Sequence, residues 1–173
     1  MISIIAGKYK GRKLYDAKDL HMRPTQANVR KSVFQILEPF NGMDVLDLYA
    51  GVGTFGIEAM SRGANRVVFV ERNRRVFKVL KKNIVLFESD QCDLFLTDAL
   101  QFLNRVKNQY FDIIFADPPY TKVSFHSIKE KVESILNPDG IFCMEMKKES
   151  IDEPNIRVKH YGNTQMVFWS SAA

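Results

Sequence analysis

The 173-residue sequence predicts an α/β fold whose central sheet is doubly wound and mostly parallel. After residue 43, short runs rich in β-branched and aromatic residues alternate with segments in which apolar residues recur at helical spacing. The β-rich runs are almost continuously hydrophobic, as expected for parallel strands that are covered on both faces. Two more β-rich runs flank Gly162-Asn163 and predict an antiparallel hairpin at the sheet edge.

The individual elements can be placed in chain order. The expected strands are 44–49, 66–71, 93–97, 111–116 and 141–147, followed by the hairpin strands 156–161 and 164–169. The expected helices are 54–62, 73–87, 99–107 and 124–136. Helix 73–87 has the clearest periodicity, and Asn73 is a suitable N-cap for it. Gly63 is well placed to end helix 54–62.

The N-terminal segment does not follow this alternation. Ile2–Ala6 and Lys8–Tyr15, separated by a glycine, are expected to form a β-hairpin. A helix is expected to begin near Pro24-Thr25. We therefore expect this segment to pack on the rest of the chain as an appendage.

Charge is distributed unevenly along the sequence. Residues 1–40 contain eight bases and three acids, whereas residues 41–173 contain 17 of each. The whole formal charge of +5 therefore comes from the first segment. This predicts a basic appendage at 1–40 that binds a polyanion, joined to a main domain at 41–173. If charge were the only observation, a solvated basic face without a partner would be favoured.

Composition and short-range patterns exclude several classes of protein. Hydrophobic residues make up 46% and charged residues 26%, which is typical of a globular protein. The opening MISIIAG has too few apolar residues before its first lysine for a signal peptide or a membrane span. Cys92 and Cys143 lack metal-ligand spacing, and His21, His126 and His160 are scattered. We expect a cytoplasmic monomer with no metal and no membrane partner.

A glycine-rich motif follows the first expected strand. In VLDLYAGVGTFG (45–56), the strand leads through Gly51 and Gly53 into a helix whose first amides can bind a ligand. The spacing also fits a dinucleotide-binding fingerprint or a plain tight turn. Asp47 favours a different ligand, because a buried carboxylate needs a donor or a cation and would repel a phosphate. We expect Asp47 to face the cationic amino-acid end of a cofactor.

Two further acids lie at the ends of expected strands. Glu71 closes VVFVE and is placed to accept both hydroxyls of a ribose, although a solvated acid at a strand end is equally consistent. Asp98, in Thr97-Asp98-Ala99, is placed either to accept a hydrogen bond from an adenine amino group or simply to cap the next helix. Because open α/β sheets bind ligands at the carboxyl ends of their strands, the convergence of these residues predicts a cofactor site.

The sequence DPPY, at 117–120, follows the apolar fourth strand. An exocyclic amine of a nucleobase is a poor nucleophile, because its lone pair is delocalised into the ring. Acceptors for its N–H hydrogens would aim that lone pair: the Asp117 carboxylate and the Pro118 carbonyl, which Pro119 holds rigid. Tyr120 would offer a flat face to an unstacked base. A proline-rich turn without chemistry is the alternative, and the three preceding strand ends disfavour it.

These motifs resemble class I S-adenosylmethionine-dependent methyltransferases, and more closely the RsmD family of 16S ribosomal RNA guanine-N2 methyltransferases. The similarity covers nearly the whole chain and includes IIAGKYKGRKL, RPT followed by VRKSVFQIL, DLYAGVGTFGIEAMSRGA, VERN, DPPY and YGNT. The RPT…VR stretch is the more specific part, since many unrelated methyltransferases share the fold motifs. The resemblance implies a Rossmann-like class I methyltransferase fold, S-adenosylmethionine as cofactor, and 16S ribosomal RNA in the small ribosomal subunit as partner.

The resemblance also implies a role for each site residue. It assigns the target guanine to Asp117, Pro118, Pro119 and Tyr120. It assigns the methionine end of the cofactor to Asp47, Gly51 and Gly53, the ribose to Glu71, and the adenine to Asp98 with Ala99, and it adds Tyr49 and Arg72 to the same cofactor site. It assigns the RNA to Lys10, Arg12, Lys13, Arg23, Thr25 and Arg30.

Three other functions stay open. An adenine-N6 methyltransferase acting on DNA or RNA would also use DPPY. A nucleotide-binding oxidoreductase would use the glycine-rich turn for a pyrophosphate, although Asp47 and DPPY disfavour it. An RNA-binding module would keep the fold without catalysis.

Overall fold

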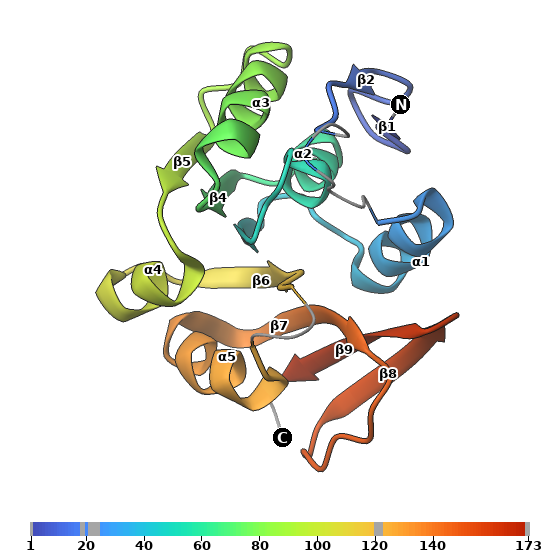
Figure 1. Cartoon of the computed structure of the whole chain (residues 1–173), viewed down its shortest axis with the longest axis vertical. Coiled ribbons are helices and arrows are strands. Elements are labelled where there is room, and N and C mark those ends of the chain that lie inside the picture. Colours follow the sequence, from blue (N-terminus) through green and yellow to red (C-terminus); the bar gives the residue numbers. More distant parts are fainter. Residues whose placement is uncertain (1, 18–19, 21–24, 120–122, 172–173) are drawn as a thin grey trace.

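The computed structural model describes residues 2–17, 20, 25–119 and 123–171 (Figure 1). Its helices are α1 (Ala27–Leu37), α2 (Thr54–Ser61), α3 (Arg74–Val85), α4 (Ala99–Arg105) and α5 (Phe125–Val132), with the 3₁₀ turn η2 at Glu133–Ile135. Its strands are β1 (Ile2–Ser3), β2 (Lys13–Leu14), β3 (Asp44–Leu48), β4 (Arg66–Glu71), β5 (Cys92–Leu96), β6 (Phe111–Ala116), β7 (Leu136–Lys147), β8 (Ile156–Tyr161) and β9 (Thr164–Ser170). Each element expected after residue 43 is present.

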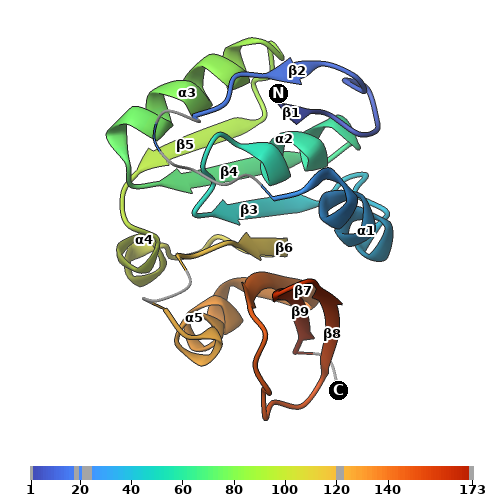
Figure 2. The same ribbon diagram turned by 45° about the vertical axis from the view of Figure 1, so that its right-hand side comes forward.

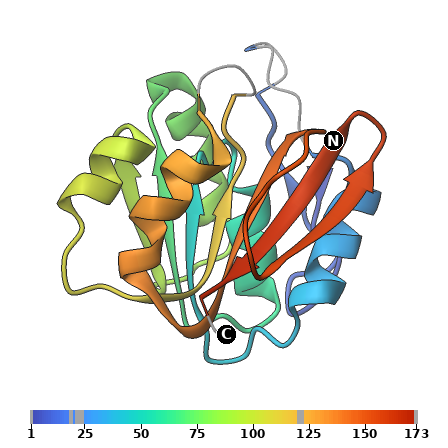
Figure 3. The same ribbon diagram turned by 90° about the horizontal axis from the view of Figure 1, so that it is seen from below.

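The main sheet has seven strands in the order β5-β4-β3-β6-β7-β9-β8. The pairs from β5 to β7 are parallel, whereas β9 pairs antiparallel with both β7 and β8. Side chains of α1, α2 and α3 join one hydrophobic cluster, and those of α4 and α5 join another. Figure 3 shows α4 and α5 on the opposite side of the sheet from α1. These features confirm the predicted doubly wound, mostly parallel sheet with an antiparallel C-terminal hairpin.

The region between α5 and β7 differs most from the expected elements. α5 stops at Val132, and β7 begins at Leu136, earlier than expected. The segment 137–140 interrupts the register between β6 and β7. Its sequence, Asn-Pro-Asp-Gly, favours a turn, because Pro138 has no N–H to donate and Asp139 adopts a φ of +63°. The sequence predicted a break here but not the strand residues before it.

The N-terminal hairpin is shorter than the sequence predicts. The ladder of β1 and β2 contains two residue pairs, because the residues between them bond to α2. The Lys8 N–H donates to the Ser61 carbonyl over 2.7 Å, and the Tyr9 N–H donates to Ser61 Oγ over 2.9 Å. Gly7 has a φ of +82°, and a Cβ there would lie 1.9 Å from the Ser61 carbonyl oxygen. The glycine is therefore needed for contact with α2, and the strands pair only beyond it.

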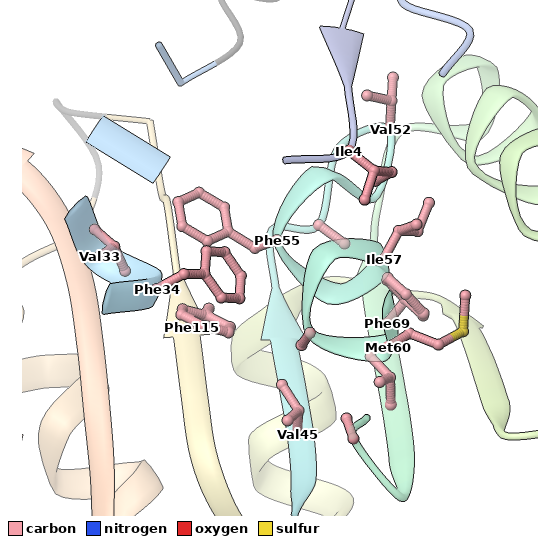
Figure 4. Close-up of a cluster of buried hydrophobic side chains, with 14 of the residues drawn as sticks. Ile4, Val33, Phe34, Val45, Val52, Phe55, Ile57, Met60, Phe69 and Phe115 are labelled. Atoms are coloured by element: carbon pink, nitrogen blue, oxygen red, sulfur yellow. The ribbon is translucent and has the colours of Figure 1, made fainter. Parts of the chain in front are cut away.

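An aromatic cluster joins the N-terminal segment to the main sheet (Figure 4). The ring of Phe34 in α1 lies 5.9 Å from that of Phe55 in α2 and 5.6 Å from that of Phe115 in β6. Ile4 and Val33 belong to the same buried cluster. The two predicted parts of the chain therefore share one core, and their division at residue 40 stays a prediction.

Candidate functional site

A cleft of about 920 Å³ opens at the carboxyl ends of the central strands, with a smaller cavity of about 100 Å³ beside it. Open α/β sheets bind ligands at this edge, and the volume of the cleft is in the range of small-molecule sites. Among the predicted site residues, the cleft is lined by Thr25, Tyr49, Glu71, Arg72, Ala99, Asp117, Pro118 and Pro119. The smaller cavity is lined by Thr25, Asp47, Tyr49, Gly51 and Asp117. The fold thus brings together most of the residues predicted for the cofactor and the target base.

The glycine-rich turn connects β3 to α2 in a conformation that needs glycine. Gly51 and Gly53 have φ values of +59° and +93°, a region that side chains disfavour. At Gly53 a Cβ would also lie 2.6 Å from the side chain of Leu80 in α3. The turn therefore stays narrow, and the backbone amides at the start of α2 lie beside the smaller cavity.

Asp47 is buried on β3 under this turn. Its Oδ2 accepts a hydrogen bond from the Gly56 N–H over 2.9 Å, so the carboxyl group holds the first turn of α2 in place. Burial raises the pKa of Asp47 well above its usual value, and the carboxylates of Asp117 and Glu71 raise it further against the opposing effect of the Gly56 hydrogen bond. Negative charge at this position is therefore costly without a cationic partner.

Glu71 closes β4 and is held by two backbone groups. Its Oε2 accepts from the Gly51 N–H over 3.0 Å, and its Oε1 accepts from the Asn73 N–H over 2.7 Å. A carboxylate has about four acceptor positions, so these two bonds leave capacity for ribose hydroxyls. Glu71 therefore has a structural role in fixing the glycine-rich turn, and its contact with a ribose stays a prediction.

Asp98 begins α4 as its N-cap, one of the two roles that the sequence left open. Its Oδ1 accepts from the Leu100 N–H over 2.9 Å and from the Gln101 N–H over 3.3 Å. Arg72 Nη1 lies 3.7 Å from its other oxygen. Burial raises the pKa of the adjacent Tyr49 to about 12; Asp98 also raises it, and Arg72 lowers it. Contact between Asp98 and an adenine stays a prediction.

Asp117 and Pro118 follow β6 and line the cleft. Burial raises the pKa of Asp117 to about 8, and the Glu145 carboxylate contributes to the same shift. Pro118 is buried and Pro119 is exposed. Tyr120 lies outside the described residues, so its predicted role as a stacking face is not placed.

Glu145 is a site residue that the sequence analysis missed. Because Ala116 of β6 pairs with Met144 of β7, Asp117 just after β6 lies beside Glu145 in β7. Glu145 is 8% exposed, lines the cleft and accepts a hydrogen bond from the Thr25 hydroxyl over 2.9 Å. A signal was available in the sequence, since an acid inside the apolar run IFCMEM is as unusual as the acid in the first strand.

The four carboxyl groups at this edge favour a ligand that carries positive charge. They belong to Asp47, Glu71, Asp117 and Glu145, all of which line the cleft or the smaller cavity. A cation among them would stabilise their ionised forms, whereas a pyrophosphate would add to the repulsion. Arg72 and Lys147 also line the cleft, so the repulsion of a pyrophosphate applies beside the glycine-rich turn, where Asp47 and Asp117 line the smaller cavity.

The residues predicted to bind RNA do not all lie on one surface. Lys10, Arg12 and Lys13 are exposed. Arg30 is not: it is 3% exposed, and its Nη2 donates to the Ser3 carbonyl over 3.2 Å. It shares the i, i+4, i+7 stripe of Phe34 and Leu37, the face that α1 buries, and we therefore correct its assignment to packing α1 against β1. Arg23 lies outside the described residues.

The described part of the chain contains neither a cluster of metal ligands nor a membrane-spanning helix. No three side chains of His, Cys, Asp and Glu gather there in a way that would hold a metal ion. Within the same ranges, no helix has the length and apolarity needed to cross a bilayer.

The sequence matches a family model and several known relatives. The model described as Conserved hypothetical protein 95 (Cons_hypoth95) matches residues 2–170. Ribosomal RNA small subunit methyltransferase D of Haemophilus influenzae is 33% identical over 157 residues, which cover 86% of this chain and 80% of the relative. The protein of the same name from Buchnera aphidicola subsp. Acyrthosiphon pisum is 34% identical over 158 residues, which cover 88% and 82%.

Solved structures show the same architecture. The Escherichia coli protein YhhF superposes with a TM-score of 0.87 at 28% identity, covering 99% of both chains. Precorrin-6Y C5,15-methyltransferase of Geobacter metallireducens superposes with a TM-score of 0.70 at 17% identity, covering 92% of this chain and 95% of that one. At that identity, the second match supports the fold alone.

Proposed function

The chain belongs to the RsmD family of ribosomal RNA small subunit methyltransferases, and we propose that it transfers a methyl group from S-adenosylmethionine to the exocyclic N2 amine of a guanine in 16S ribosomal RNA. The position of the predicted site residues supports the proposal independently of the family. Asp117 and Pro118 reach the same cleft as Glu71 and Ala99, so acceptors for a base amine and the predicted cofactor residues share one site.

S-adenosylmethionine fits the chemistry of the residues in this cleft. When bound, it supplies a methyl group on a positively charged sulfur. Asp47 and the turn at Gly51 and Gly53 would hold its amino-acid end, Glu71 its ribose, and Asp98 with Ala99 its adenine. Calorimetry with S-adenosylhomocysteine and with NAD tests this assignment, and tighter binding of NAD would contradict it.

The chain's own groups would orient the amine of the base. The Asp117 carboxylate and the Pro118 carbonyl would accept its two N–H hydrogens, which leaves the nitrogen lone pair directed at the methyl group. Both acceptors interact more strongly as positive charge develops on the nitrogen, so they would favour the transition state over the ground state. Asp117 would then receive the departing proton, and its raised pKa suits it to that role.

The carboxyl groups also favour guanine over adenine, the target in the second candidate function. An ionised carboxylate only accepts hydrogen bonds, so Asp117 could take both the N1–H and an N2–H of guanine. Adenine presents an acceptor at N1, which Asp117 and the neighbouring Glu145 would repel. Equal rates of transfer to guanine-containing and adenine-containing RNA would contradict this preference.

We expect kcat/KM for methyl transfer to rise with pH up to about 8. Asp117 must be ionised to accept hydrogen bonds, and its pKa in the free protein is about 8. Glu145→Gln removes a charge that raises this pKa, so the rising part of the profile should move to lower pH. The exposed Glu149→Gln is the matched control and should leave the profile in place. A wild-type profile that is flat between about pH 6 and pH 9 would contradict the assignment.

The raised pKa of Asp117 also makes the stability of the folded protein depend on pH. A carboxyl pKa raised from 3.8 to about 8 means that the folded chain holds a proton which the unfolded chain has released. The contribution of Asp117 to stability is therefore fully present below about pH 4 and is lost as the pH rises through about 8. Urea denaturation of the wild type and of Asp117→Asn over this range would measure the difference.

The proposed function itself is tested in cells. Methylated nucleotides in small-subunit RNA are mapped by mass spectrometry, in strains with and without this protein. We expect one N2-methylguanine to be lost without the protein and restored by the wild-type chain. Identical methylation in both strains would contradict the proposal.

A further inference from the structure

We infer that α3 is part of the RNA-binding surface and extends it from the N-terminal segment to the mouth of the cleft. The inference rests on the proposed function, because it takes the RNA substrate as the partner. The surface, named here the α3 basic face, consists of Arg74, Arg75, Lys78, Lys81 and Lys82. All five side chains are exposed. These five residues belong to the part of the chain, residues 41–173, that has no net charge.

The five bases share one side of the helix. At about 100° per residue they fall within an arc of about 120°, while Val76, Leu80 and Ile84 are buried on the other side. Six side chains of α3 are exposed, and Val85 is the one without a charge. A solvated helix usually mixes acids and bases on its polar face, but residues 72–87 contain no Asp or Glu.

Most of this arrangement does not stabilise the helix, although Lys82 lies in the last turn, where the helix dipole favours positive charge. Arg74 and Arg75 lie in its first turn, where the helix dipole disfavours positive charge. Lys78 lies four residues from both Arg74 and Lys82, a spacing at which like charges repel. In the part of the chain that the structure describes, none of the five bases forms an ion pair. Phosphates lying along the face would remove this repulsion.

The α3 basic face continues into the basic N-terminal segment. Arg12 Nη1 donates to the Leu86 carbonyl, just after α3, over 3.0 Å. The Arg12 guanidinium also lies over the rings of Tyr9 and Phe87, 5.2 and 5.8 Å from their centroids. Figure 2 shows the β1–β2 hairpin beside α3. The exposed bases of this hairpin are Lys8, Lys10, Arg12 and Lys13.

The other end of the α3 basic face reaches the cleft. Arg72 and Asn73 line the cleft, and α3 begins at the next residue. The helix has 12 residues, a length of about 18 Å. An RNA strand along it would therefore pass from the N-terminal segment to the cleft that Asp117 lines. An anionic membrane or an acidic protein would match the charge, but neither would deliver a nucleobase to the adjoining cleft.

The test compares two variants that each lose three positive charges. The test variant is Lys78→Gln/Lys81→Gln/Lys82→Gln. The control variant is Arg105→Gln/Lys107→Gln/Lys131→Gln, on and beside α4 and α5 across the sheet. Binding of a 16S ribosomal RNA transcript is titrated at 50 and 200 mM salt, together with binding to vesicles that contain phosphatidylserine. Each phosphate contact contributes about 0.7–0.9 to the salt dependence, so wild-type affinity should fall roughly 20- to 40-fold more than that of the test variant between these salt concentrations.

The outcomes separate this inference from the proposed function. We expect the test variant to lose RNA affinity at low salt and to raise KM for RNA, while kcat is kept, thermal stability is not lowered and the control variant matches the wild type. If the wild type binds and methylates RNA but the test variant behaves like the control, the inference is overturned and the proposed function stands. A loss of vesicle binding without loss of RNA binding would also overturn it. If the wild type neither binds nor methylates RNA, the proposed function fails.

Discussion

Replacing Asp117 with alanine should lower the rate of methyl transfer by about 10²- to 10³-fold while RNA affinity stays close to that of the wild type. The carboxylate lines the cleft at the end of β6, and it would hold the amine and accept its proton. These interactions are stronger in the transition state than in the ground state, so their loss should lower kcat more than it raises KM. Single-turnover transfer to small-subunit RNA, at saturating S-adenosylmethionine, measures the effect.

Two further variants make the Asp117 result specific. Asp117→Asn should lose nearly as much activity, because its amide directs N–H donors at the amine. Asp90→Ala removes an exposed acid between α3 and β5 and should keep full activity. An Asp117→Ala protein that retains activity within about threefold of the wild type would show that another group orients the amine.

Glu58→Ala should lower the free energy of unfolding by about 3–5 kcal/mol. Glu58 is fully buried in α2 and accepts hydrogen bonds from the N–H groups of Ile5 and Ala6 over 2.8 and 3.0 Å. Arg62 Nε lies 2.9 Å from the same carboxylate. Alanine would leave two backbone donors and a guanidinium without this acceptor, and the N-terminal segment would lose its attachment to α2. Urea denaturation measures the change.

A matched pair of variants distinguishes burial from charge in this prediction. Glu133 forms an i, i+4 pair with Lys129, like that of Glu58 with Arg62, but its side chain is 50% exposed. Glu133→Ala should change stability by no more than about 0.5 kcal/mol. If the two variants destabilise the protein equally, Glu58 does not anchor the N-terminal segment.

The order and type of the main elements could be predicted from local patterns. Strands β4 and β6 have the expected bounds, 66–71 and 111–116, because their apolar runs are buried on both faces and end at polar or proline-containing turns. The N-terminal hairpin was predicted too long. Its length depends on the contact of Gly7 with Ser61, which lies far away in the sequence.

The candidate site could be predicted wherever one residue is anomalous in its own segment. Asp47 interrupts an apolar strand, and Asp117 is followed by two prolines. Glu145 has the same signal, but its importance depends on the pairing of β6 with β7, which places it beside Asp117. Whether an acid at a strand end belongs to the site therefore depends on which other strand end lies next to it.

The amino-acid sequence by itself determined the alternation of strands and helices, the glycine-rich turn and the acids that close the strands. Each of these features depends on residues only a few positions apart. Packing decided the rest. It buried Arg30 in the face that α1 presents to the core, and it brought the end of α3 next to Arg12, although α3 belongs to a part of the chain with no net charge. Exposure and proximity are properties of the folded surface, so a count of charges along the chain does not report them.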